Sequence, residues 1–191
     1  MQRRLKFFAL CAVLATLAGC AATRPTQVLP ASNASIEAFS LNGRVAVKID
    51  DRGYTASLRW RHSATQDSIR LLSPVGSVVG QIEADGNGAT LTTGDRKVFH
   101  SNDAQALTRD VLGWDLPLSG LRYWVTGRVD PALPVQAQER DDKQRLKSLT
   151  QNDWRIAYLE YVGDSALPAR LSLAFDRLNL RLIIEHWELP P

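Results

Sequence analysis

The stretch Phe39-Ser-Leu-Asn-Gly-Arg-Val-Ala-Val-Lys-Ile49 is followed by the turn signal Asp51-Arg-Gly53 and then by Tyr54-Thr-Ala-Ser-Leu-Arg-Trp-Arg61. In both flanking segments apolar side chains alternate with polar ones, and this period of two places the apolar set on one face of a β-strand. A short turn between two such segments predicts an antiparallel hairpin. These two predicted strands indicate the fold class, which is a β-sheet with one apolar face.

The same pattern continues on both sides of the chain's middle. Short turn signals rich in Gly, Pro, Asn and Asp separate the segments. Further strands are predicted at residues 68–72, 77–84, 89–93, 97–100, 144–149, 154–161, 169–176 and 179–187. Between residues 130 and 142 the chain contains prolines and then charges, so we expect a long loop there.

The middle of the chain changes to a helical period. Asp103 is a candidate N-cap for a helix that runs to Leu112 and stops at Gly113. A second amphipathic helix is predicted at residues 118–126, between Pro117 and Gly127. About ten antiparallel strands with two amphipathic helices favour one mainly β, strongly curved sheet whose concave side the helices cover. Such a sheet can enclose an apolar cavity.

Residues 1–19 have the three parts of a secretory signal peptide: a basic start, an apolar run and small residues before a cut. The apolar run is too short to span a bilayer, which takes about 20 residues. Leu17-Ala-Gly-Cys20 reads as a lipobox, so we expect cleavage before Cys20 and an S-diacylglycerol and an N-acyl chain on that cysteine. An unmodified cysteine that follows small residues by chance is the alternative. Residues 20–35 are then a lipidated flexible tether, and residues 36–191 a single domain.

The charge balance argues against a nucleic-acid partner. The chain has 23 basic and 20 acidic residues, but three of the basic ones and no acidic one lie in the signal peptide. The mature chain is therefore balanced, and no cationic run remains to neutralise phosphates. Since Cys11 leaves with the signal peptide and Cys20 carries lipid, no internal disulfide is expected.

Catalytic and metal-binding patterns are not found in the sequence. His62, His100 and His186 are far apart and form no ligand pair at helical or zinc-finger spacing. No Gly-x-Ser-x-Gly elbow, phosphate loop or free thiol is present in the mature chain. We therefore expect no enzyme activity, no metal and no cofactor besides the covalent lipid on Cys20.

Binding is the remaining class of function. The five tryptophans lie in or beside predicted strands and helices, where they could form an ordinary core or the wall of a pocket for an acyl chain. The turn Ser73-Pro-Val-Gly76 suits a type I turn and places Val75 at an exposed tip. With Val78 and Val79 close behind, this tip could dip into the membrane to which the protein is tethered. An incidental apolar surface residue is the alternative.

Six segments, in order along nearly all of the mature chain, resemble one family: the outer-membrane lipoprotein receptors of the LolB family. The lipobox at Cys20 adds to the resemblance. The segments are Phe39-Ser-Leu-Asn-Gly-Arg44, Ser57-Leu-Arg-Trp60, Ser73-Pro-Val-Gly76, Leu112-Gly-Trp-Asp-Leu-Pro-Leu118, Leu121-Arg-Tyr-Trp-Val-Thr-Gly127 and Gln151-Asn-Asp-Trp-Arg-Ile-Ala-Tyr158.

The resemblance implies an incomplete, half-open antiparallel β-barrel with a helical lid over a hydrophobic cavity. It further implies a monomer that takes the acyl chains of lipoproteins from the periplasmic carrier LolA and releases them into the inner leaflet of the outer membrane. Pro74, Val75 and Gly76 match the family's membrane-insertion loop, and Val75 stands where the loop carries a leucine. Ala21 after the lipidated cysteine fits outer-membrane sorting, since an aspartate there would commonly retain a lipoprotein at the inner membrane.

These expectations lead to candidate residues and to competing hypotheses. The two predicted helices, at residues 103–112 and 118–126, would open as the lid. An acidic rim of the carrier could be steered by Arg59, Arg61 and Arg70, which we expect on or near a stretch of sheet edge. A solvated face without a partner is the alternative for these arginines. A structural lipoprotein with a packed interior, acting as an envelope assembly scaffold, is the main alternative, and a lipid-anchored hydrolase a weaker one. The cavity candidates are Val45, Val47, Leu58, Trp60, Leu107, Leu121 and Trp124.

Overall fold

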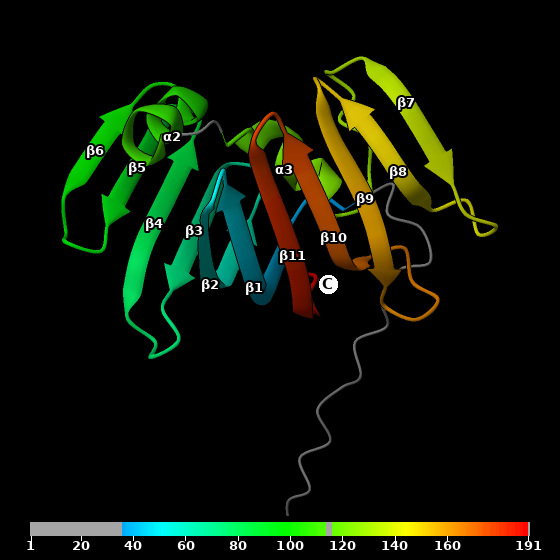
Figure 1. Ribbon diagram of the computed structural model, residues 1–191, viewed down its shortest axis with the longest axis horizontal. Coiled ribbons are helices and arrows are strands. Elements are labelled where there is room, and N and C mark those ends of the chain that lie inside the picture. The colour runs from blue at the N-terminus through cyan, green and yellow to red at the C-terminus, as the bar shows by residue number, and fades with distance from the viewer. Residues whose placement is uncertain (1–35, 114–115, 191) are drawn as a thin grey trace, which may run out of the picture.

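The computed structural model describes residues 36–113 and 116–190, so the predicted signal peptide, Cys20 and the tether lie outside the described residues. Eleven antiparallel strands form one open sheet, and two helices accompany it (Figure 1). The mainly β class is confirmed. The strands are β1 Phe39–Ile49, β2 Arg52–His62, β3 Gln66–Leu72, β4 Val78–Asp85, β5 Gly88–Thr93, β6 Val98–Ser101, β7 Val135–Arg140, β8 Leu146–Gln151, β9 Trp154–Tyr161, β10 Pro168–Phe175 and β11 Leu178–Glu188.

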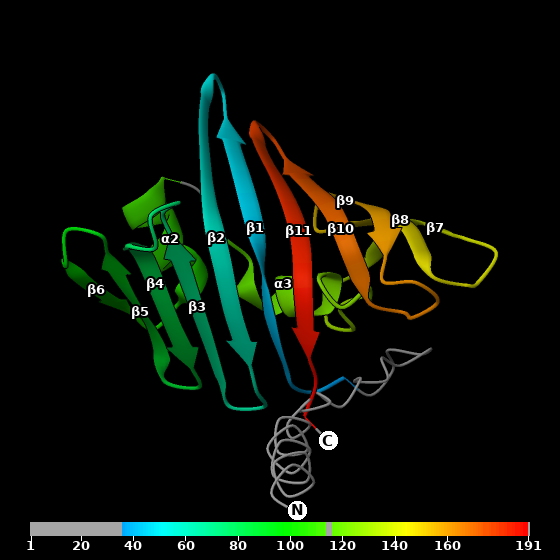
Figure 2. The same cartoon turned by 90° about the horizontal axis from the view of Figure 1, so that it is seen from below.

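Pairing between the first and last strands joins the two halves of the chain. The order across the sheet is β6-β5-β4-β3-β2-β1-β11-β10-β9-β8-β7, so each half is a meander and β1 pairs with β11. The two edges, β6 and β7, stay unpaired with each other. Because both helices lie between β6 and β7 in sequence, the chain must cross from one edge to the other. In Figure 2 the sheet lies in front and both helices lie behind it, on its concave face.

Alternation along the strands fills the concave face with buried apolar side chains. In β2, Leu58 and Trp60 are buried while Arg59 and Arg61 are exposed. Opposite β1, Leu180 and Leu182 pair with Val47 and Val45. These side chains form one core with the apolar faces of the helices. The incomplete barrel with a helical cover is therefore confirmed.

Strand β7 contradicts the long loop predicted for residues 130–142. Residues 135–140 pair with β8, for example Gln138 with Leu149. All six side chains of β7 are exposed, and Val135 and Ala137 give too short an apolar alternation to predict a strand. Backbone hydrogen bonds to β8 define the strand, together with an ion pair at 2.9 Å between Lys147 Nζ and Glu139 Oε1.

Helix α2, Ala104–Leu112, begins and ends where the sequence predicted. Asp103 Oδ1 accepts hydrogen bonds from Gln105 N at 2.8 Å and Ala106 N at 3.3 Å, which satisfies two free amides of the first turn. Gly113 ends the helix with φ +81°, a left-handed conformation that glycine adopts without strain. In the described part of the chain no helix combines the length and apolar character needed to cross a membrane.

Helix α3, Leu118–Trp124, ends two residues before the predicted boundary at Thr126. Thr126 Oγ1 donates to the carbonyls of Arg122 and Tyr123, and the amide of Arg128 also bonds to Tyr123 O at 2.9 Å. These bonds use the last free carbonyls of the helix and turn the chain away from the helix axis.

A buried glutamine fixes the C-terminal end of α3 to the sheet. Gln151 Oε1 accepts from Trp124 Nε1 at 3.0 Å and from Asp130 N at 2.9 Å. Gln151 Nε2 donates to the carbonyls of Asp130 at 3.0 Å and Leu133 at 2.9 Å. All four bonding positions of this amide are used, so the side chain can be fully buried without an unpaired group.

Removal of this amide tests its structural role. Gln151→Ala leaves two buried donors and two carbonyls without their partner, so the free energy of unfolding should fall by about 3 kcal/mol or more. Urea denaturation followed by tryptophan fluorescence measures this change. Gln138→Ala, on the exposed strand β7, is the matched control and should change it by no more than about 0.5 kcal/mol. Equal stability of the two variants would show that the network contributes nothing.

Gly43 sits at an irregularity in the β1–β11 pairing, where the register shifts between Asn42 and Gly43. A Cβ atom built on Gly43 would lie 2.1 Å from the carbonyl oxygen of Ile183. No real Cβ contact is this short, so only glycine lets β1 approach β11 this closely.

Gly43→Ala should therefore lower the free energy of unfolding by about 1–3 kcal/mol, because the backbone of one strand must move. Gly53→Ala is the control, since a Cβ at Gly53 meets nothing within 4 Å. We expect that variant to be unchanged or slightly stabilised. Thermal and urea unfolding of both variants measure the difference, and an unaffected Gly43→Ala protein would contradict the close approach.

Candidate acyl-chain cavity and insertion loop

An apolar cavity of about 100 Å³ lies on the concave side of the sheet, between the strands and the helical segment. Strands β1–β4, β10 and β11 supply most of its wall, and α2, α3 and the residues beside them supply the rest. Among residues 36–113 and 116–190, no charged side chain lines it, and its exposed surface is apolar. The lining residues are Val45, Val47, Leu58, Trp60, Ile69, Leu71, Ile82, Leu112, Leu116, Leu121, Val125, Leu173, Leu180 and Leu182.

Five of the seven cavity candidates from the sequence lie in this wall: Val45, Val47, Leu58, Trp60 and Leu121. The other two candidates are buried elsewhere. Leu107 belongs to the general core under α2, which packs against β5 and β6. Trp124 is occupied by its hydrogen bond to Gln151 and by its ring contact with Trp154 at 5.9 Å.

The remaining lining residues were not among the sequence-based candidates. Leu180 and Leu182 share one face of the last strand in the sequence pattern, but only the pairing of β11 with β1 places that face in the cavity wall. Ile69 and Ile82 come from strands whose concave face the sequence does not define. The apolar alternation in these strands identifies Ile69 and Ile82 as lining residues only once the strand register is known.

Trp60 is a rigid part of the cavity wall. Its Nε1 donates to Asp67 Oδ1 at 2.7 Å, and the same carboxylate oxygen lies 2.8 Å from His62 Nδ1. The Phe39 ring meets the Trp60 ring edge to face at 5.3 Å. Among the described tryptophans only Trp60 lines the cavity, so an ordinary core accounts for the burial of the others.

The free volume of the cavity is small for a ligand pocket. Ligand pockets usually hold about 300–1,000 Å³, which is at least three times the free volume found here. This space accommodates a few methylene groups but no complete acyl chain. An acyl chain would fit here only if part of the wall moved outward.

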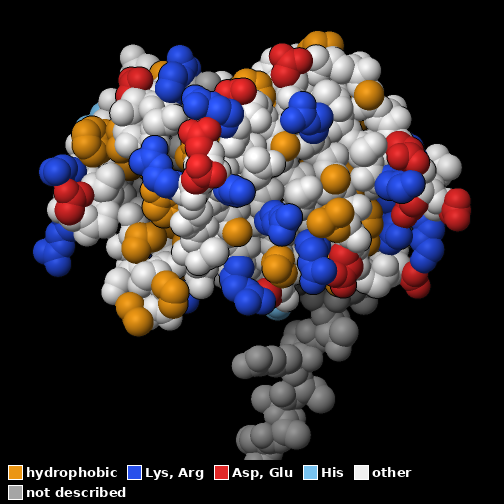
Figure 3. All heavy atoms as spheres, viewed as in Figure 1, with side chains coloured by type: hydrophobic (Ala, Val, Ile, Leu, Met, Phe, Trp, Pro, Cys, Tyr) orange, Lys and Arg blue, Asp and Glu red, His pale blue; other side chains and the backbone are white. Residues whose placement is uncertain are grey.

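The predicted turn between β3 and β4 is present and holds Val75 away from the rest of the molecule. Gly76 N donates to Ser73 O at 2.8 Å, and Ser73 N donates to Ser77 O at 2.8 Å. Gly76 has φ +84°, which its lack of a side chain permits. Val75 is 88% exposed, more than any other large apolar residue described. Hydrophobic side chains gather at this end of β3–β4, at the lower left of Figure 3.

The three arginines predicted as a docking site are exposed on the convex face, away from the cavity. The predicted location near a sheet edge is wrong, because β2 and β3 are interior strands. Arg59 and Arg70 lie directly opposite each other in the β2–β3 pairing, and Arg61 pairs with Ser68. This position does not face the cavity that a cargo would enter, so exposure to solvent is sufficient to explain these residues.

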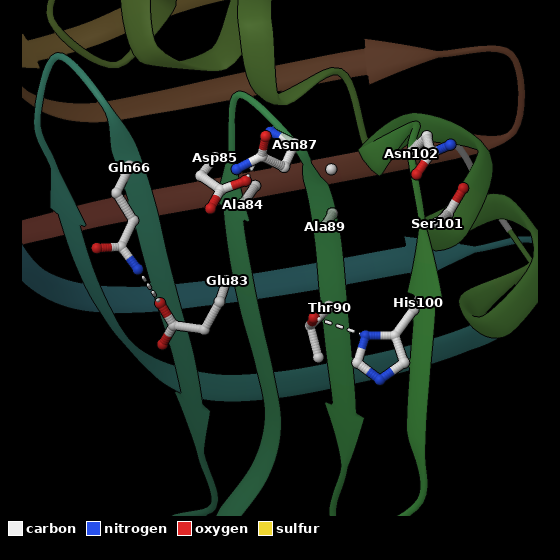
Figure 4. A pocket seen from close by; sticks show the side chains of 11 residues that line it. Gln66, Glu83, Ala84, Asp85, Asn87, Ala89, Thr90, His100, Ser101 and Asn102 are labelled. Carbon is white, nitrogen blue, oxygen red and sulfur yellow. Dashed lines mark hydrogen bonds between the residues drawn. The ribbon is translucent and has the colours of Figure 1, made fainter.

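A second hollow, of about 390 Å³, is polar and lies over β3–β6 (Figure 4). Glu83 accepts hydrogen bonds there from Ser68 Oγ at 2.8 Å and from Gln66 Nε2 at 3.3 Å. Thr90 Oγ1 and His100 Nδ1 lie 2.9 Å apart. These polar groups bond to one another, and no group of three His, Cys, Asp or Glu residues in residues 36–113 and 116–190 is placed to hold a metal ion.

Comparison with known proteins agrees with this arrangement. Residues 37–187 match the family model described as "Outer membrane lipoprotein LolB". The Nitrosomonas europaea protein named outer-membrane lipoprotein LolB is 32% identical to this chain, over 92% of this chain and 89% of that protein. The protein of the same name from Thiobacillus denitrificans is 34% identical, over 94% of this chain and 98% of that protein. The Nitrosococcus oceani protein is 38% identical over 81% of this chain and 78% of its own length.

One solved structure shows the same type of fold at low sequence identity. A DUF1329 family protein from Desulfovibrio piger superposes with a TM-score of 0.50 at 5% identity, over 82% of this chain and 87% of that one. The family model and the relatives cover most of the chain, including the closed apolar cavity and the turn at Val75. The chain therefore belongs to the LolB family of outer-membrane lipoproteins.

Proposed function

We propose that this outer-membrane lipoprotein accepts lipoproteins from the periplasmic carrier LolA through its acyl-chain cavity and inserts them into the inner leaflet of the outer membrane. The observation that carries the proposal is a cavity that the described residues line with apolar side chains, on the concave face of a sheet that the helical segment covers. Cys20 would carry the lipid that anchors a monomer to this membrane. No catalytic step is required.

Transfer without an energy source requires that each successive site holds the acyl chains more favourably. A tenfold preference over the carrier corresponds to about 1.4 kcal/mol. Each methylene removed from water contributes about 0.8 kcal/mol. Two additional buried methylenes in this cavity would therefore suffice, and the bilayer would shield the chains still better on release.

The two helices differ in how firmly the sheet holds them. Trp124 at the end of α3 bonds to Gln151, and Tyr158 Oη donates to Trp124 O at 3.0 Å. Burial, with a smaller effect of Tyr161, raises the pKa of the Tyr158 hydroxyl well above its ordinary value, so this donor stays protonated. Helix α2 instead packs against β5 and β6 near one edge. We therefore assign the opening motion to α2, with α3 as a fixed wall, in place of a lid made of both helices.

The exposed turn would perform the delivery step. Val75 projects from the sheet on a short hydrogen-bonded turn, and Val78 and Val79 behind it are 45% and 46% exposed. Transfer of one valine side chain into lipid contributes about 1.5–3 kcal/mol, which is enough to bias contact with the membrane but too little to anchor the protein.

The central test follows a lipidated cargo protein loaded on LolA and mixed with the soluble Cys20→Ala form of the mature chain. We expect the cargo to move to this protein without added energy. Leu71→Gln, in the cavity wall, should weaken uptake about tenfold or more because it introduces a polar group. Leu72→Gln, the next residue and equally half-buried, is the control, because its pairing with Ser57 places it on the convex face.

Two results would contradict this proposal. Cargo that stays on an active carrier, while this domain is shown to be folded, would favour the envelope-scaffold alternative. Equal loss of uptake in both leucine variants would show that the cavity is not the acyl-chain site.

Substitution of the turn separates delivery from uptake. Val75→Glu should leave uptake from LolA unchanged and reduce insertion into vesicles about tenfold or more, since the favourable burial of valine is replaced by a charge. Val75→Leu should increase insertion, because it adds one methylene. Val98→Glu alters an exposed valine on edge strand β6 and should have no effect on insertion. A fall in uptake equal to the fall in insertion would contradict this division of roles.

A further inference from the structure

A groove of about 410 Å³ opens on the convex face at the base of the insertion turn. It crosses β1, β2 and β11, and Pro74 of the turn forms part of its wall. The groove thus connects directly to the segment that carries Val75. Its lining residues are Arg44, Val45, Ala46, Thr55, Ala56, Ser57, Pro74, Arg181 and Ile183.

Arg44 and Arg181 supply two guanidinium groups to this groove, whose surface is otherwise mostly apolar. Arg44 pairs with Ile183 and Arg181 pairs with Ala46 in the β1–β11 ladder, so the two arginines are diagonal neighbours on one face. Arg44 Nε lies 2.7 Å from Glu185 Oε1, so its charge is partly compensated, and its side chain is 64% exposed. In the described residues Arg181 forms no ion pair, and no acidic side chain lines the groove.

Hydroxyl groups complete the set of hydrogen-bond donors. Thr55 pairs with Ala46 and Ser57 pairs with Arg44 in the β1–β2 ladder, which places both hydroxyls on the same face as the arginines. Guanidinium and hydroxyl donors around one hollow are suited to a phosphate group, to which arginine can bind through two nitrogens at once.

We propose that this groove binds the phosphate of a phospholipid headgroup in the membrane that Val75 enters, a role that rests on the proposed function. Pro74 belongs to the groove and Val75 is the next residue at the tip. When the tip reaches the acyl region of the leaflet, the groove at its base lies at the level of the headgroups. The apolar tip sets how deeply the protein enters the leaflet, and the arginines favour anionic lipid. Together these two contacts orient the protein on the membrane.

Vesicle binding of the Cys20→Ala form of the mature chain tests this site without carrier or cargo. The probes are phosphatidylcholine vesicles with and without one third phosphatidylglycerol, in low salt, with co-sedimentation as the readout. We expect tighter binding to the anionic vesicles and about fivefold weaker binding for Arg181→Gln or Arg44→Gln. Arg181→Lys should retain much of the affinity, because it keeps the charge.

Arg155→Gln is the matched control, since Arg155 is exposed and lies on β9, on the opposite wing of the sheet from the turn. It changes the net charge by the same amount and should bind vesicles like the unaltered chain. Equal losses of vesicle binding in Arg155→Gln and Arg181→Gln would overturn the proposed phosphate site and indicate attraction by net charge alone. The proposed site would also be overturned if the unaltered chain bound vesicles equally well with and without phosphatidylglycerol. Because cargo transfer is not measured, either result is distinct from a failure of the transfer proposal.

Discussion

The pairing of β1 with β11 is the contact on which the rest of this architecture depends. It joins two meanders into one sheet and leaves β6 and β7 as separate edges. The chain between those edges crosses the concave face, where the two helices lie and the cavity forms. The close approach of the two strands at Gly43 is therefore a condition for the cavity, although that glycine does not line it.

The cavity can change volume only if some of its walls are fixed and others are not. Gln151 satisfies a set of buried polar groups that connect α3 to β8, and such fully paired networks resist local opening. Helix α2 is capped by Asp103 and Gly113 but rests on the outer strands β5 and β6. Of the two helices that cross the concave face, α3 is therefore held rigidly and α2 is easier to displace.

Alternation and capping signals were enough to predict most strands, both helices and the turn at Val75, because these features are encoded by neighbouring residues. Strand β7 was missed because its side chains are exposed on both faces and its order comes from β8. Leu107 and Trp124 were misplaced for a related reason: an apolar residue of a helix can face several neighbours, and sequence does not choose among them. The arginine groove could not be predicted either, since the register of β11 on β1 is what brings Arg44 and Arg181 together.

An open sheet exposes backbone hydrogen-bonding groups at each edge, and these can recruit a strand from another molecule. A lipid anchor would concentrate such molecules on one surface and increase this hazard. Here β7 is mostly polar, with Glu139 and Arg140 near its end, and β6 has only four residues. Both features discourage the growth of a sheet across neighbouring copies. The exposed, mostly polar side chains that concealed β7 in the sequence therefore also protect this open barrel against aggregation.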